Sequence, residues 1–170
     1  QLLLAAYAKV GSFFTDIQNF EKGLEYYSKA IPILDTVKFN IGAAYYLNLG
    51  FCYNNLGAPE KALPYLKKSL AIDIEDNDEL SMASSYNNMG DTYKNLGNIA
   101  KALECFNNAL TISTKINEKK RMLTALIHIA RIDFEKGDLN AAEEKCYQAL
   151  VYAKELKNIN RIQRASCPTS

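Results

Sequence analysis

The chain has 170 residues, a length that suits one ordinary domain or a short array of repeats. It is 48% hydrophobic and 23% charged, which is an ordinary composition for a water-soluble protein, and no apolar run approaches the roughly 18 residues that span a membrane. Twenty basic residues against nineteen acidic ones leave a formal net charge of +1, which argues against nucleic acid as the principal ligand because phosphate binding needs a clear positive excess.

The four cysteines, Cys52, Cys105, Cys146 and Cys167, form no Cys-x-x-Cys pair. None stands at metal-ligand spacing from His128, the only histidine, so we expect no zinc site, no other metal and no cofactor. The first three fall in apolar helical stretches, where an unpaired thiol behaves as a small hydrophobic residue. Free thiols of this kind favour a reducing compartment, so we expect a cytoplasmic protein.

The first predicted repeat covers about residues 2–38. Apolar or small residues at positions 7, 10, 11 and 14 follow the i, i+3, i+4, i+7 spacing of one helical face. A second stretch with Gly23, Tyr27, Ala30 and Ile31 follows it. We therefore expect two helices that pair as an antiparallel hairpin.

The second and third predicted repeats, about residues 39–78 and 79–118, carry the same pattern forty residues apart. In the second repeat it reads Tyr46-x-x-Leu49-Gly50-x-x-Tyr53-x-x-x-Gly57, then Ala62, Leu66 and Leu70. In the third it reads Tyr86-x-x-Met89-Gly90-x-x-Tyr93-x-x-x-Gly97, then Ala102, Phe106 and Leu110. The glycine at position 50 or 90 lets a neighbouring helix approach closely, and the glycine at position 57 or 97 ends the first helix because it adopts positive φ easily.

The fourth predicted repeat covers about residues 119–157 and keeps the pattern at Leu126, Ile129, Ala130, Gly137, Ala142, Ala149 and Leu150. Asn160-Arg161-Ile162 stands forty residues after Lys120-Arg121-Met122. Residues 158–170 are therefore expected to start a fifth helix or to form a C-terminal cap over the last apolar face. Because the chain begins with Gln1 and not with methionine, we expect a longer natural array.

The four copies resemble the tetratricopeptide repeat family over about residues 2–157. The small residue Gly50, the aromatic Tyr53 and the alanine Ala62 match the family motif. The spacing near 40, against about 34 in the ordinary repeat, is similar to an extended subclass found in kinesin light chains, spindle-orientation adaptors and peptide-regulated bacterial signalling proteins. It predicts longer inter-repeat turns or longer helix ends.

This resemblance implies an all-α fold, a right-handed α-solenoid of four antiparallel helix hairpins. Its first helices are expected to line a concave binding surface. On these helices a stripe of residues spaced by three or four positions shares one face. With the neighbouring Lys94 and Phe134, the candidate binding residues are Asn48, Phe51, Asn55, Asn88, Asp91, Lys94, Asn95, His128, Arg131 and Phe134.

Asn48 and Asn88 are the central pair of this set. An asparagine amide offers both a donor and an acceptor, which suits the backbone of an extended peptide. The resemblance implies the same role, since extended-repeat members use a ladder of such asparagines. The alternative is that both side chains satisfy neighbouring backbone or each other. His128 is either a third position of this ladder or a structural residue.

Phe51 either marks a pocket for a ligand side chain or packs between repeats. Arg131 with Lys94 could hold an acidic ligand group. The family's clamp for a C-terminal carboxylate is not expected, because Ala8 and Ser84 stand where it needs basic residues.

Three functions remain open at this point. The first is a module that binds an extended peptide or a protein segment in its concave groove. The second is the sensor or regulatory part of a larger signalling protein, and the third is an architectural array that self-associates through its repeat ends. Catalysis is not expected, because the chain has no Gly-rich phosphate loop and no serine in a strand-turn-helix elbow.

Overall fold

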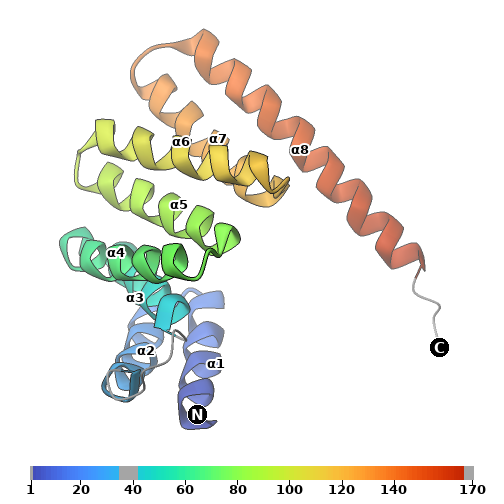
Figure 1. The fold of residues 1–170 in the computed structure, drawn as a ribbon. Helices are drawn as coiled ribbons and strands as arrows, with labels where there is room; N and C mark the ends of the chain where they lie inside the picture. Colours follow the sequence, from blue (N-terminus) through green and yellow to red (C-terminus); the bar gives the residue numbers. More distant parts are fainter. Residues whose placement is uncertain (1, 35–41, 167–170) are drawn as a thin grey trace.

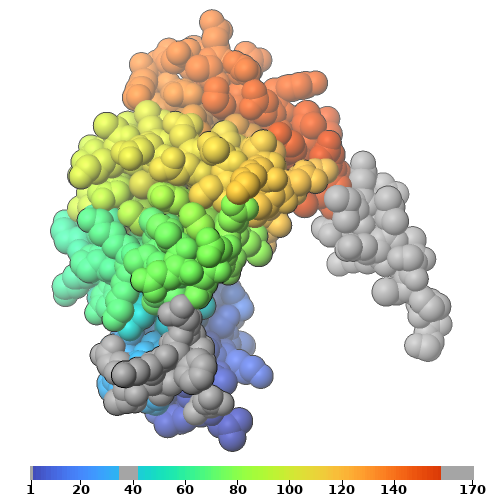
Figure 2. Space-filling view, viewed as in Figure 1, coloured from blue at the N-terminus to red at the C-terminus, as the bar shows by residue number. Residues whose placement is uncertain are grey.

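The computed structural model describes the backbone of residues 2–34 and 42–166, with side chains placed in 2–34 and 42–157. Within these ranges it has eight helices and no strand: α1 (Leu2–Asp16), α2 (Phe20–Leu34), α3 (Ala43–Asn55), α4 (Pro59–Glu75), α5 (Glu79–Asn95), α6 (Ile99–Lys115), α7 (Lys119–Glu135) and α8 (Leu139–Ser166). Consecutive helices pair as antiparallel hairpins that stack in chain order (Figures 1 and 2). The expected all-α solenoid of four hairpins is confirmed.

A unit of twenty residues sets the geometry of the array. From α4 onward, successive helices begin at Pro59, Glu79, Ile99, Lys119 and Leu139. The four helices α4 to α7 each contain 17 residues, and three residues connect each helix to the next. The repeat near 40 residues is therefore two helix-and-turn units, and its extra length lies in the helices and not in the turns.

The three-residue turns repeat one hydrogen-bonding pattern. At the end of α5, Gly97 has a φ of +75°, and the Asn98 amide donates to the Tyr93 carbonyl at 2.9 Å. The Asn98 side chain then accepts from the Lys101 amide at 3.1 Å and caps the start of α6. The same residue thus closes one helix and begins the next, which fixes the angle of the hairpin.

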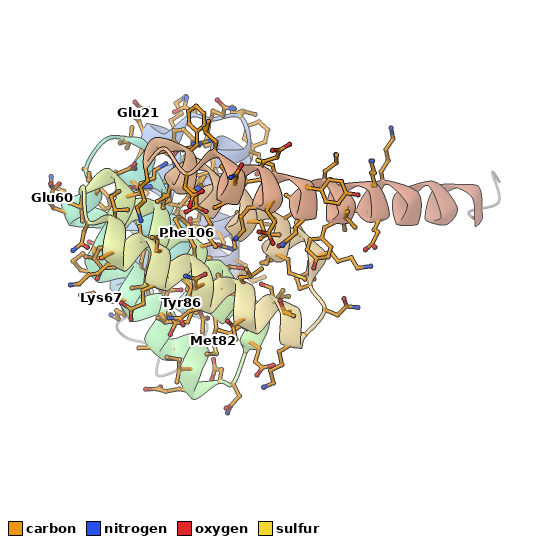
Figure 3. All side chains as sticks on the ribbon, turned by 90° about the horizontal axis from the view of Figure 1, so that it is seen from above. Glu21, Glu60, Lys67, Met82, Tyr86 and Phe106 are labelled. Atoms are coloured by element: carbon orange, nitrogen blue, oxygen red, sulfur yellow. The ribbon has the colours of Figure 1, made fainter. Side chains whose placement is uncertain are left out.

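The glycines inside the first helices mark close contacts within each hairpin. Gly50 lies against Leu66, and a Cβ on this glycine would come within 2.5 Å of the Leu66 side chain. Gly90 lies against Phe106 in the same way, at 2.6 Å. Leu66 and Phe106 are fully buried, and in Figure 3 Phe106 lies inside the array. The small residue in the motif is therefore required by the large residue that packs against it.

A buried carboxyl group lies where the second hairpin meets the third. Asp73, at the end of α4, is 2% exposed and accepts a hydrogen bond of 2.7 Å from the Ser85 hydroxyl of α5. Ser69 lies 3.2 Å from Ser85, oxygen to oxygen, and donates to the Ala43 carbonyl of α3 at 2.9 Å. This small polar cluster joins three helices at a position where the rest of the contact is apolar.

The C-terminal segment differs from the expected start of a fifth helix or separate cap. Residues 158–166 continue α8, which is 28 residues long and extends past the end of its partner α7 (Figure 1). No break separates residues 158–166 from the helix of the fourth repeat, because no glycine or proline stands between Leu139 and Ser166. Residues 167–170 lie outside the described part. Among the described helices, none combines the length and the apolar character needed to cross a membrane.

Candidate functional site

A groove of about 710 Å³ runs across the first helices of all four hairpins. Each of α1, α3, α5 and α7 turns one face toward it, as expected when hairpins stack with their first helices side by side. We call it the inner groove, and it is lined by Ser12, Thr15, Asp16, Leu47, Asn48, Phe51, Ser84, Asn87, Asn88, Lys120, Arg121 and Thr124. Ten of these twelve residues are polar or charged, and both signs of charge are present.

The two asparagines expected at the centre of the site both line the inner groove. Asn48 is half-buried, and its side-chain amide makes no hydrogen bond to the described residues. The Asn88 amide donates to the Ser84 carbonyl of its own helix at 2.9 Å, which leaves the side-chain oxygen for another donor. Asn88 thus realises part of the backbone-satisfying alternative, whereas the donor and the acceptor of the Asn48 side chain stay unpaired among the described residues.

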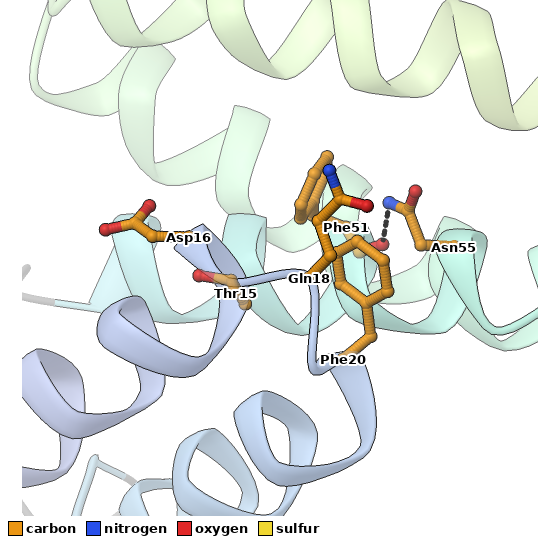
Figure 4. A pocket seen from close by; sticks show the side chains of 6 residues that line it. All are labelled: Thr15, Asp16, Gln18, Phe20, Phe51 and Asn55. Carbon is orange, nitrogen blue, oxygen red and sulfur yellow. Dashed lines mark hydrogen bonds between the residues drawn. The ribbon is translucent and has the colours of Figure 1, made fainter.

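Phe51 is 37% exposed and forms the boundary between the inner groove and a second hollow of about 520 Å³. Its ring meets the Phe20 ring edge to face, with centroids 5.7 Å apart. Asn55 lines the same hollow and donates to the Phe51 carbonyl at 2.8 Å. We call this hollow the aromatic pocket, and Thr15, Asp16 and Gln18 complete its lining (Figure 4).

Four other candidates contact one another across the first helices. Asp91 of α5 accepts from the Asn54 amide of α3 at 3.1 Å, and the Asn95 amide donates to the Asn54 side-chain oxygen at 3.0 Å. Lys94 lies 3.4 Å from the Asp91 carboxylate, nitrogen to oxygen, and His128 Nδ1 of α7 lies 3.7 Å from it. This polar network links three successive repeats. It engages the polar groups of side chains that the sequence suggested for ligand binding.

His128 lies against the hairpin core and not in the groove lining. Its ring stacks on Phe106 with centroids 4.7 Å apart and planes 5° apart, and its Nδ1 atom is buried without a hydrogen bond. Burial lowers the pKa of His128 below its ordinary value, although the nearby Asp91 carboxylate acts in the opposite direction. The groove position expected for His128 is taken by Thr124, one helical turn earlier.

Arg131 and Phe134 stay outside both hollows. Both side chains are exposed, Phe134 at 63%, and neither lines the inner groove or the aromatic pocket. Arg131 lies close enough to His128 for its charge to help lower the pKa of that histidine, but it enters neither hollow, and Lys94 is engaged with Asp91.

The groove residues that the sequence reasoning missed include Asn87, Lys120 and Arg121. Asn87 is 7% exposed, and its side-chain oxygen has no hydrogen-bond donor. The Arg121 Nε atom donates to the Ser84 hydroxyl at 3.1 Å, which aims this side chain across from α7 to α5. A signal was present, since Lys120-Arg121 opens the fourth repeat, but the residues lie before the stripe that the motif defines.

Metal binding has no visible basis in the part of the chain that the structure describes. Among those residues, no three histidine, cysteine or acidic side chains converge on a common point.

Comparison with known sequences and structures gives one consistent result. The profile of the tetratricopeptide repeat family matches residues 2–75 and 81–167. No curated protein sequence matches the chain.

Three solved structures share the fold of this array. A crystal structure of MamA matches with a TM-score of 0.68 and 19% identity, over 91% of this chain and 81% of that one. BtubC (BKLC) from P. vanneervenii matches with a TM-score of 0.77 and 21% identity, over 99% and 67%. A STAND protein with a tetratricopeptide repeat sensor, from Pyrococcus horikoshii, matches with a TM-score of 0.78 and 19% identity, over 93% of this chain but only 25% of that protein.

Proposed function

Because this chain belongs to the tetratricopeptide repeat family, whose repeats generally serve as protein–protein interaction modules, we propose that it binds an extended segment of a partner protein in the inner groove. The observation that carries this proposal is the set of unsatisfied polar side chains that face the groove from neighbouring helices. Among the described residues, neither the donor nor the acceptor of the Asn48 side chain is engaged, and the side-chain oxygen of Asn88 has no donor. An extended peptide offers amide and carbonyl groups at regular intervals, so it can satisfy both.

The aromatic pocket supports the same function. It adjoins the inner groove through the shared residues Thr15, Asp16 and Phe51. A segment that follows the groove would reach this pocket with one side chain. The partly exposed Phe51 ring, supported from the side by Phe20, offers a rigid apolar surface of the kind that anchors an interface.

The test uses random linear peptides displayed on phage and selected on the purified chain. Affinities of the selected peptides are then measured by fluorescence polarisation for wild type and for an Asn48→Ala, Asn88→Ala variant. We expect the variant to bind at least about tenfold more weakly, because each lost hydrogen bond leaves a ligand group unpaired.

Asn107→Ala is the matched control, since Asn107 is an exposed asparagine on α6 that lines neither hollow. It should bind the peptides as wild type does. Equal affinities for wild type and the double variant would show that the peptides bind elsewhere, and the groove proposal would then be wrong.

A second candidate is self-association through the two ends of the stack. Large apolar side chains stay exposed on the first helix, Leu2, Leu3 and Phe13 among them, and on the last helix, where Tyr147 and Leu150 are exposed. Leu150 stands forty residues after Leu110 and eighty residues after Leu70, and both of these leucines pack against the core within the array. The exposed end surfaces favour the stacking of one copy on another.

A further inference from the structure

We propose, building on the groove function, that the bound segment is dipolar: it places a carboxylate against Asn87, Lys120 and Arg121 at one end of the inner groove, and a basic group against Asp16 at the other. The carboxylate end is formed by Lys120 and Arg121 of α7 with Asn87 of the neighbouring α5, and the other end lies on α1, with α3 between them. The ligand would therefore bind in one direction only.

Two cations at the α7 end of the groove have no acidic partner among the described residues. Four basic residues surround the turn before α7, and two of them are neutralised: Lys115 pairs with Glu79, and Lys119 pairs with Glu155 at 2.8 Å. Lys120 and Arg121 line the groove, and no carboxylate lies within ion-pair distance of either among the described residues. The basic side chains outside the groove are thus paired with acidic ones, whereas the two that line the groove have no acidic partner among the described residues.

Arg121 is also held in place for a ligand. Its Nε atom donates to the Ser84 hydroxyl at 3.1 Å, so the guanidinium group is fixed across the gap between α7 and α5. The terminal nitrogens make no hydrogen bond to the described residues. A guanidinium group with two parallel donors recognises a carboxylate in a bidentate arrangement.

Asn87 provides independent evidence for ligand binding at this end of the groove. Its side chain is 7% exposed, lines the groove and makes no hydrogen bond to the described residues, and its buried oxygen has no donor. A buried polar group without a partner is rare in folded proteins. An arriving acidic residue offers its own backbone amide as a donor and its carboxylate as an acceptor, so one residue of the ligand can satisfy both Asn87 and Arg121.

The opposite end has the complementary charge. Asp16, at the C-terminal end of α1, lines both the inner groove and the aromatic pocket. Its carboxylate is exposed, and no basic side chain among the described residues lies within ion-pair distance of it. A lysine or arginine of the segment that enters here would meet the acid while its apolar stem covers Phe51.

The test uses the peptides selected on wild type and measures their affinities for charge-reversed variants. We expect the selected sequences to contain an acidic residue on one side of a basic residue in a constant order. A Lys120→Glu, Arg121→Glu variant should bind them at least about tenfold more weakly. Exchanging the acidic residue of the peptide for lysine should restore part of the affinity for that variant and reduce it for wild type.

Controls separate this proposal from its alternatives. Lys67→Glu reverses an exposed cation at the periphery of the array (Figure 3) and should leave binding unchanged. An Arg121→Gln variant, checked by thermal unfolding, removes the charge with little change of shape and should also weaken binding. Amidation of the peptide C-terminus distinguishes the two sources of the carboxylate: weaker binding identifies the chain end, and unchanged binding identifies an acidic side chain.

The outcomes also separate this inference from the groove function. Peptides that lose affinity for the Asn48→Ala, Asn88→Ala variant but not for the Lys120→Glu, Arg121→Glu variant would overturn the dipolar ligand and leave the groove function standing. Peptides that bind both variants as tightly as wild type would overturn both.

Discussion

At the scale of single residues, the buried carboxyl group of Asp73 makes the free energy of unfolding depend on pH. Burial between α4 and α5 raises the pKa of Asp73 above the ordinary value of 3.8, and the nearby acids Asp78 and Asp76 act in the same direction, whereas the hydrogen bond from Ser85 opposes the shift. The folded state therefore holds the proton at a pH where the unfolded chain has released it. The contribution of Asp73 to the free energy of unfolding is therefore fully present below pH 3.8, and it is lost as the pH rises through the raised pKa.

We expect an Asp73→Asn variant to lack this loss of stability, because its amide stays neutral and its oxygen still accepts from Ser85. The measurement is urea unfolding of wild type and variant over a series of pH values from the acid range to neutrality. The free energy of unfolding of wild type should fall relative to that of the variant as the pH rises. An Asp16→Asn variant serves as the control with an exposed carboxyl group. Parallel curves for wild type and Asp73→Asn would contradict the expectation.

The candidate site shows which groove residues can be predicted from residue spacing alone. Spacing by three and four placed Asn48, Phe51 and Asn88 on one surface, because helical geometry fixes which side chains share a face. The same spacing also selected Asp91 and His128, which instead face the neighbouring first helix or the core. Periodicity along one helix does not reveal where the next helix crosses it. Residues that line the groove and residues that face a neighbouring helix therefore look alike in the sequence.

Asn87 was missed for a related reason. It stands one residue before the asparagine column, at a position that the repeat pattern leaves unspecified. Its unpaired oxygen becomes visible only when the helices around it are placed. Arg121 likewise reaches the groove by crossing from α7 to Ser84 on α5, a contact between residues 37 positions apart.

At the scale of elements, the turns explain why the fold was predictable. The glycine that ends each first helix recurs at positions 57, 97 and 137, all with positive φ. The turns between hairpins use asparagine in the same conformation, at Asn77 and Asn117. These residue types tolerate the left-handed region, so the helix ends could be located from the sequence. The C-terminal part of α8 lacked such a signal, and its continuation to Ser166 was not predicted.

Gln18 is the exception among the turn residues, since it holds a φ of +59° without being glycine, asparagine or aspartate. It occupies the position that glycine takes in the later hairpins, and the Asn19 amide closes the turn onto the Phe14 carbonyl at 2.8 Å. A Gln18→Gly variant should therefore be more stable by about 1 kcal/mol, because the left-handed conformation disfavours a side chain.

The measurement is the free energy of unfolding from urea titration. Gln148→Gly, at an exposed position in the middle of α8, is the matched control and should lose about 1 kcal/mol because glycine weakens a helix interior. A loss of stability in both variants would show that the turn at Gln18 is not strained.

At the scale of the whole molecule, the two ends of the stack differ from its middle. Internal hairpins bury their apolar faces against neighbours on both sides, whereas the first and last hairpins each have one open face. Repeat arrays need polar outer faces at their ends to remain dispersed. Here the end helices carry exposed apolar residues, with Leu2 at 91% and Tyr147 at 68% exposure.

We expect the isolated chain to associate as its concentration rises, with the α8 face of one copy covering the α1 face of another. Sedimentation velocity over a range of concentrations measures this association. A Leu150→Gln variant should associate only at higher concentration, because the glutamine places a polar group on the open face of α8. Ile74→Gln changes an exposed apolar residue of similar size on α4, in the middle of the array, and should have no effect. A sedimentation coefficient that is independent of concentration in wild type would rule out this association.

The uniform turns have a consequence for how such a chain changes over evolutionary time. Residues 79–118 begin just after one turn and end with another turn of the same geometry. A duplication of this stretch joins α6 to a second copy of α5, and an in-frame deletion joins α4 to α7, so both place a first helix after a second helix in the register that the chain already uses. Unequal crossing-over within the gene therefore yields proteins that differ by whole hairpins and remain foldable. Each such event also inserts or removes one groove-lining first helix, together with its partner helix, between α1 and α7, and so lengthens or shortens the span between Asp16 and Arg121.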